Sequence, residues 1–256
     1  MSRSNKDTLA ENPAKRFFEW NGGNGTLTYY DKETKENIEV ARPFRFLVLD
    51  EVATVGGGID EGDGYIGYWS NAIRPRNARV TPFVVRSSHK GKSRIEQTGI
   101  WADIKANLVG AKYIKGLYIG YFEGDELTLG YLKIRGAALT PWMDLAHIHK
   151  QIDVGAWQIL KDSTTKKKGS NTYYEPIIEY IPTVKDETEE AATALDREVL
   201  QPYLTAYFGQ QMAQGVEAVE SDEYDEYSPN VDDTPPDEQE TASQTEPYDS
   251  PDQIPF

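Results

Sequence analysis

The sequence contains no cysteine, so disulfide bonds and thiolate metal sites are excluded. It also lacks a Gly-x-Ser-x-Gly nucleophile motif, and its glycine runs are not followed by the Lys-Ser/Thr pair of a phosphate-binding loop. No run of about eighteen apolar residues is present, and the polar N-terminus has no apolar signal core. These absences predict a cytoplasmic protein that needs no cofactor.

The sequence has only three histidines, and they are not spaced like metal ligands. His147 and His149 are two positions apart in a predicted helix, where they point in different directions. No cysteine or clustered carboxylate joins them. His89 lies in a basic polar stretch, where a solvated side chain is a better interpretation than a general base. We therefore predict neither a metal site nor an enzymatic activity.

Basic residues are missing from one end of the chain. From Glu217 to Phe256 there are fourteen Asp and Glu, six prolines and no Lys or Arg. Such a segment cannot bury enough apolar surface to offset its ordering entropy, so residues 210–256 are predicted to be a disordered acidic tail. Residues 1–185 carry 26 basic against 22 acidic residues, which favours a body that binds polyanions. A tail that only maintains solubility would give the same charge balance.

The remainder of the chain has a mainly β pattern. Strands are predicted at residues 17–20, 26–30, 38–55, 65–73, 80–86, 112–122, 127–134, 156–161 and 173–181, with a glycine-rich loop at 56–64. Helices are predicted at 97–108, 141–149 and 186–201, the last interrupted at Pro202. We expect residues 1–14 to be flexible and residues 15–209 to form a small barrel or sandwich with elaborated loops.

Aromatic residues interleaved with basic residues are the clearest chemical signal. Single-stranded nucleic acid needs this combination, because cations contact phosphates while rings stack on unpaired bases, contributing roughly 1–3 kcal/mol per base. No recognition helix for duplex DNA is evident. The predicted DNA-binding residues are Lys15, Arg16, Trp20, Tyr30, Trp69, Arg74, Arg76, Arg79, Arg86, Lys90, Lys92, Arg94, Lys112, Tyr113, Lys115, Lys166, Lys167, Lys168 and Tyr173.

The alternative explanation for these rings is core packing, because alternate residues of a strand face inward. Runs of charge are also commonly solvated loops. The strongest single candidate is the predicted loop at residues 162–172, which contains Lys166, Lys167 and Lys168. It would cap a hairpin, where a mobile basic finger could close over a nucleic-acid strand.

The last residues carry a family resemblance. Asp252-Gln253-Ile254-Pro255-Phe256, behind an acidic tract, resembles the tail of bacterial single-stranded DNA-binding proteins, which ends in aspartates followed by Ile-Pro-Phe and recruits replication and repair partners. The body lacks the usual bacterial N-terminal strand sequence and is longer than a minimal barrel. The chain is therefore more similar to the divergent single-stranded DNA-binding proteins of bacteriophages.

This resemblance implies an OB-fold-like barrel with extra hairpins, single-stranded DNA as the ligand and the bacterial host cytoplasm as the location. It also implies that replication and recombination proteins dock on Asp252, Ile254, Pro255 and Phe256, and it leaves the oligomeric state open. The tail, some forty residues from Glu217, spans on the order of 35 Å as a flexible coil. We expect it to compete with DNA for the basic body.

Two other functions fit the same sequence. The first is a recombination accessory protein that actively pairs complementary strands. The second is a structural protein, such as a virion component, in which the acidic tail is a spacer. Affinity for oligo-dT at moderate salt separates the structural function from the other two.

Overall fold

The computed structural model describes residues 11–60, 62, 64–150, 152, 153 and 155–213. The strands are β1 (Arg16–Asn21), β2 (Thr26–Asp31), β3 (Glu36–Glu39), β4 (Phe44–Asp60), β5 (Tyr65–Ser70), β6 (Phe83–His89), β7 (Lys92–Gly99), β8 (Ala111–Glu123), β9 (Glu126–Ile134), β10 (Trp157–Lys168) and β11 (Asn171–Ile181). The α-helices are α1 (Trp101–Ile104), α2 (Leu139–Ile148), α3 (Asp186–Leu195) and α4 (Gln201–Ala213). Short 3-10 turns occur at η1 (Pro75–Asn77), η2 (Lys105–Asn107) and η3 (Gly136–Ala138), and a π-helical turn, η4 (Asp196–Leu200), joins α3 to α4. The predicted mainly β class is confirmed.

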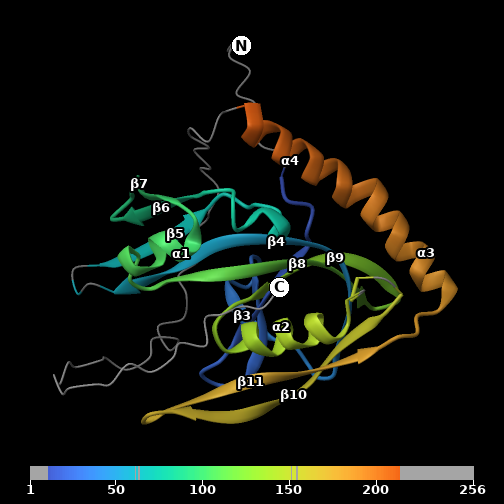
Figure 1. Ribbon diagram of the computed structural model, residues 1–256. Coiled ribbons are helices and arrows are strands. Elements are labelled where there is room, and N and C mark those ends of the chain that lie inside the picture. Colours follow the sequence, from blue (N-terminus) through green and yellow to red (C-terminus); the bar gives the residue numbers. More distant parts are fainter. Residues whose placement is uncertain (1–10, 61, 63, 151, 154, 214–256) are drawn as a thin grey trace.

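One open, mixed sheet organises the molecule (Figure 1). Its strand order is β3-β2-β1-β9-β8-β4-β5-β6-β7, and the β10–β11 hairpin joins it through β4. The β1–β9 pair is parallel, whereas the other pairs are antiparallel. The 17-residue strand β4 pairs with β8 along one edge, and with β10 and then β5 along the other. None of the described helices is long and apolar enough to cross a membrane.

Three hydrophobic cores lie on the two faces of this sheet. The first core, which includes Phe18 and Leu117, is enclosed by the sheet, α2 and the β10–β11 hairpin (Figure 1). The second lies on the opposite face, where the α3–α4 helix covers Tyr118. The third, which includes Val55 and Phe83, lies beneath β4, β6 and β8. Because successive side chains of a strand point to opposite faces, β8 contributes to the cores on both sides.

The helix at the end of the described chain continues through Pro202, so the predicted interruption is wrong. Proline has no backbone N–H, and its ring displaces the carbonyl group four residues earlier, here that of Glu198. The wider π-helical turn η4 precedes Pro202 and accommodates this defect. The helix then continues to Ala213, past residue 210, where the acidic tail was predicted to begin. Residues 214–256 lie outside the described residues.

The predicted glycine-rich loop at residues 56–64 is also corrected. Strand β4 continues through Gly56, Gly57 and Gly58 to Asp60 and pairs with β5. Here the backbone of β4 lies very close to Gly110, since a Cβ added at Gly57 would be 2.6 Å from the Gly110 carbonyl oxygen. Gly57 also has a φ of +123°, which favours glycine. The glycines therefore permit a close strand contact instead of breaking the strand.

Three further boundaries differ from the sequence predictions. Residues 97–99 belong to strand β7, so the helix predicted at 97–108 is reduced to α1 and η2. The loop predicted at 162–172 is instead a long ladder between β10 and β11, with Lys166–Lys168 inside β10. At the N-terminus, Ala14 is buried and the Asn12 side-chain amide donates a hydrogen bond to the Tyr118 hydroxyl at 3.3 Å. The described residues 11–14 therefore pack against the body.

Candidate nucleic-acid interface

The strand register brings three predicted DNA-binding residues into one row. Gly56 of β4 lies opposite Trp69 of β5 on one side and opposite Lys112 of β8 on the other. Trp69 in turn lies opposite Arg86 of β6, and Arg86 lies opposite Ile95 of β7. Residues directly opposite each other project from the same face of a sheet. The row therefore crosses four strands and consists of Lys112, Gly56, Trp69 and Arg86. The Trp69 indole has a cation on each side of it in this row, and Gly56 contributes no side chain.

This row lies on the face of the sheet away from the third core. The neighbouring residues Val55, Tyr68 and Val85, which have the opposite orientation, pack in that core. The α3–α4 helix covers the same face further along β4 and β8, over Val52 and Tyr118. Among the row residues, Lys112 is exposed, and Trp69 and Arg86 are half-buried. The row is therefore a surface feature beside the helix.

The next row consists only of small residues and carries a second aromatic ring. From β4 to β7 this row consists of Gly58, Gly67, Ser88 and Ser93, each lying opposite the next on the neighbouring strand. The Tyr65 side chain lies on this floor, because a Cβ added at Gly58 would meet its hydroxyl oxygen at 2.3 Å. A Cβ at Gly67 would lie 3.5 Å from the Tyr65 ring. We call Tyr65, Trp69, Arg86 and Lys112, over this floor of glycine and serine, the glycine face.

Tyr65 was not among the predicted DNA-binding residues, although it begins the strand predicted at residues 65–73. Its side chain is 42% exposed, although burial of the hydroxyl raises its pKa. The available signal was the alternation of Tyr65, Gly67 and Trp69, which places both rings on one face of a strand.

Two further cations that were not predicted lie on the same side of the sheet, on β9 and just after it. Lys133 lies opposite Gly116 of β8, and Arg135 follows at the spacing that returns to the same face. Arg135 forms an ion pair with Glu19, and the Lys133 ammonium lies 3.9 Å from a Glu19 carboxylate oxygen. Burial lowers the pKa of Lys133. The Lys-x-Arg spacing was visible in the sequence, but its position beside the glycine face depends on the β8–β9 register.

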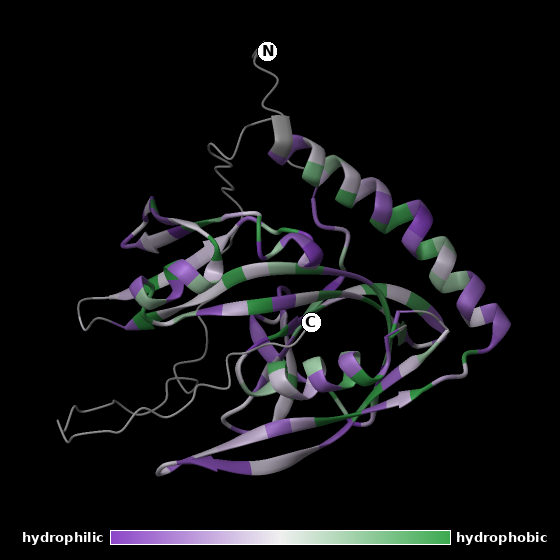
Figure 2. Ribbon diagram, in the orientation of Figure 1, coloured by the Kyte–Doolittle hydropathy of each residue, from purple (hydrophilic) through white to green (hydrophobic). Residues whose placement is uncertain are grey.

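The β10–β11 hairpin divides its three lysines between two faces. Lys166 and Lys168 are two positions apart in β10 and therefore share one face, whereas Lys167 projects from the other. Tyr173 of β11 lies opposite Lys166 and is on the same face as it. The Lys166 ammonium is 3.7 Å from a Glu175 carboxylate oxygen. Figure 2 shows hydrophilic residues along the outer part of this hairpin, which extends past α2. Lys166, Lys168 and half-buried Tyr173 form a second, smaller basic surface.

Three predicted residues instead occupy interior positions. Trp20 is 4% exposed, and its indole N–H donates to the Tyr174 carbonyl oxygen at 2.9 Å. Tyr113 packs edge-on against Phe83, and burial raises its pKa to about 12. Lys115 is 8% exposed, with its ammonium 2.8 Å from a Glu51 carboxylate oxygen. These positions alternate toward the cores, so none of the three side chains is available to a base or phosphate.

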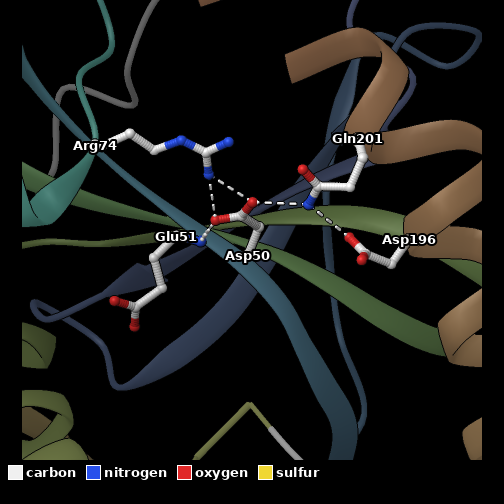
Figure 3. Close-up of polar contacts among 5 residues, drawn as sticks. All are labelled: Asp50, Glu51, Arg74, Asp196 and Gln201. Carbon is white, nitrogen blue, oxygen red and sulfur yellow. Dashed lines mark hydrogen bonds and ion pairs between the residues drawn. The ribbon is translucent and has the colours of Figure 1, made fainter. Parts of the chain in front are cut away.

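Arg74 fastens the C-terminal helix to the sheet (Figure 3). Its guanidinium donates to both carboxylate oxygens of Asp50, at 2.7 and 2.6 Å. The Gln201 side-chain amide donates to Asp50 at 3.0 Å and to Asp196 at 2.9 Å. Arg74 also lies 4.8 Å above the ring of Phe208 in α4. This network gives Arg74 a structural role, because it ties Asp50 of β4 to α4.

Other predicted cations pair with carboxylates. The Lys15 ammonium is 2.7 Å from a Glu123 oxygen, Arg16 pairs with the other oxygen, and together they hold the pKa of Glu123 below its usual range. Arg94 forms an ion pair with Glu96 at 2.5 Å.

The remaining predicted residues are exposed. Arg76 and Arg79 lie in and after η1, Lys90 and Lys92 flank the β6–β7 turn, and Tyr30 lies on β2. The β6–β7 turn is next to the glycine face, because a Cβ at Gly64 would lie 3.6 Å from Lys90 Cε. Asp252, Ile254, Pro255 and Phe256 lie outside the described residues.

The described part of the chain is thus a mainly β protein whose open mixed sheet carries aromatic and basic residues on one uncovered region. No family model, curated protein or solved structure matches the chain.

Proposed function

We propose that this protein binds single-stranded DNA on the glycine face. It would coat and protect the strand during replication, recombination and repair, and recruit partner proteins through Asp252, Ile254, Pro255 and Phe256. The observation that carries the proposal is the row in which Trp69 lies between Lys112 and Arg86 on one face of the sheet.

This row meets the physical requirements of single-strand binding. Unpaired bases need flat rings to stack on, and Trp69 and Tyr65 lie on one face of β5. The phosphates need cations beside those rings, which Lys112 and Arg86 provide. The glycine and serine floor accommodates the Tyr65 ring, which is 42% exposed and could stack on a base. Each stacked base would contribute roughly 1–3 kcal/mol with little sequence preference.

The shape of the sheet supports a distant relation to the OB-fold. The Tyr174 N–H of β11 donates to the Gly22 carbonyl oxygen after β1 at 2.8 Å. The β10–β11 hairpin is thereby held against the β1–β2 turn and closes over the first core. We propose an OB-like half-barrel in which β5, β6 and β7 extend the sheet to form the glycine face.

The first test is a tryptophan-fluorescence titration with oligo-dT over a range of salt concentrations. We expect Trp69→Ala to remove most of the quenching and to weaken binding about tenfold, equivalent to about 1.4 kcal/mol. Trp157→Ala is the control, because it removes another half-buried indole, on β10. Equal loss of affinity in both variants would contradict stacking on Trp69.

The same titration tests the cations. Lys112→Gln and Arg86→Gln should each reduce the slope of log affinity against log salt by about 0.7, as expected for one phosphate contact. Lys185→Gln, at an exposed position before α3, should leave the slope unchanged. Absence of oligo-dT binding by the wild-type chain at moderate salt would favour the structural function instead.

A further inference from the structure

Three strands of the described sheet have a neighbour on one side only: β3, β7 and β11. Such edges can pair with another chain unless the sequence prevents it. Antiparallel self-pairing of β3 about its centre would place Glu36 opposite Glu39 of the second copy, which is repulsive. Strand β11 contains Pro176, which has no N–H to donate. Strand β7 has neither of these protections.

The sequence of β7 is complementary to itself. In an antiparallel pair centred on Ile95, Ile95 lies opposite its own copy, and Arg94 lies opposite Glu96 of the second chain in both directions. Within one chain, Arg94 and Glu96 are on the same side of β7, with their charged atoms 2.5 Å apart. The same Glu96 oxygen also accepts from the Ser87 hydroxyl of β6, so the second guanidinium would share a carboxylate that is already held beside this edge. Ile95 is 51% exposed, an apolar contact at the centre.

We propose that two copies of this chain associate through antiparallel pairing of their β7 strands, centred on Ile95. The pair uses the same edge of both copies, so it closes as a two-fold dimer and does not continue into a fibre. The bulge in the β6–β7 register, where Glu96 is the extra residue, bends this edge and keeps the pairing short.

The dimer would also join two glycine faces. The row from Lys112 through Trp69 and Arg86 ends at Ile95, so pairing at Ile95 continues it into the same row of the second copy. This consequence rests on the proposed function, whereas the dimer itself does not. Oligomeric state is therefore measured without DNA, so that failure of either proposal is distinguishable from failure of the other.

The experiment is sedimentation velocity on the full chain across a concentration series. The wild type should show a reversible monomer–dimer equilibrium. Arg94→Glu places two carboxylates per chain at the contact, and Glu96→Arg places two guanidinium groups there. Each single variant should weaken self-association about tenfold or more. Lys185→Glu, an exposed charge reversal before α3, is the control and should behave as the wild type.

The decisive measurement is a mixture of the two single variants. Arg94→Glu and Glu96→Arg chains are complementary to each other, so the mixture should recover a heterodimer close to wild-type affinity. Loss of folding in either variant would not produce such recovery, and circular dichroism of each chain checks this directly. A wild type that stays monomeric throughout, or a mixture that fails to recover, would overturn the proposal.

Discussion

Whether a single residue faces a core or the solvent decides its role in this protein. Trp20, Lys115 and Tyr113 are of the residue types expected in a DNA-binding site, but their side chains face the cores. Trp69 and Lys112 are of the same residue types, but they lie together on the face of the sheet away from the third core. The sequence predicts residue types suited to binding single-stranded DNA, but the side on which each one lies depends on strand pairing between distant segments.

Lys112 and Lys115 give a direct test of this division, because they are three positions apart on β8 and face opposite sides. Lys115→Ala leaves the half-buried Glu51 carboxylate without its partner, which should lower the free energy of unfolding by about 2 kcal/mol. Its effect on oligo-dT affinity should be small. Lys112→Ala should show the reverse: a smaller loss of stability, because Lys112 is exposed, and weaker binding.

Urea denaturation and oligo-dT titration of the two variants provide the comparison. If Lys115→Ala weakened DNA binding as much as Lys112→Ala while both proteins remained folded, the assignment of Lys115 to an ion pair with Glu51 would be insufficient.

At the level of secondary-structure elements, local hairpins were predictable and long-range contacts were not. The β8–β9 hairpin follows from two β-rich segments around Glu123–Glu126, and the structure confirms it. Gly56, Gly57 and Gly58 suggested a loop because glycine usually weakens strands. Their role becomes clear only with Gly110 in contact, and nothing near them in the sequence indicates that approach. The sequence therefore predicted Trp69, Arg86 and Lys112 individually, but not Tyr65 and not the face that the four residues share.

The docking of the α3–α4 helix depends on the Asp50 network. Arg74→Ala removes a doubly hydrogen-bonded partner of Asp50 and the contact with Phe208, so the free energy of unfolding should fall by about 2 kcal/mol. Hydrogen exchange should show faster exchange of α4 amides, with oligo-dT affinity little changed.

Arg197→Ala is the matched control for this experiment. Arg197 is an exposed arginine of the same helix and forms an ion pair with the adjacent Glu198. Equal loss of α4 protection in the two variants would mean that the Asp50 network does not hold the helix.

At the scale of the whole molecule, charge is divided along the chain. Residues 186–256 contain 20 acidic residues and one basic residue, against a mildly basic body. If the acidic segment competes with DNA, a chain ending before Glu217 should bind oligo-dT more tightly than the full chain, most clearly at low salt. Titrations of both chains at two salt concentrations test this, and equal affinities would contradict competition.

Strands β4 and β8 pass through all three cores. Phe46 and Ile119 belong to the first, Val52 to the second, and Val55 and Tyr113 to the third. A fragment cut out around the glycine face would therefore lose the strands that shape it, and damage to any one core would propagate along these strands to the others. Within the described part of the chain, the glycine face and the three cores therefore depend on the same two strands.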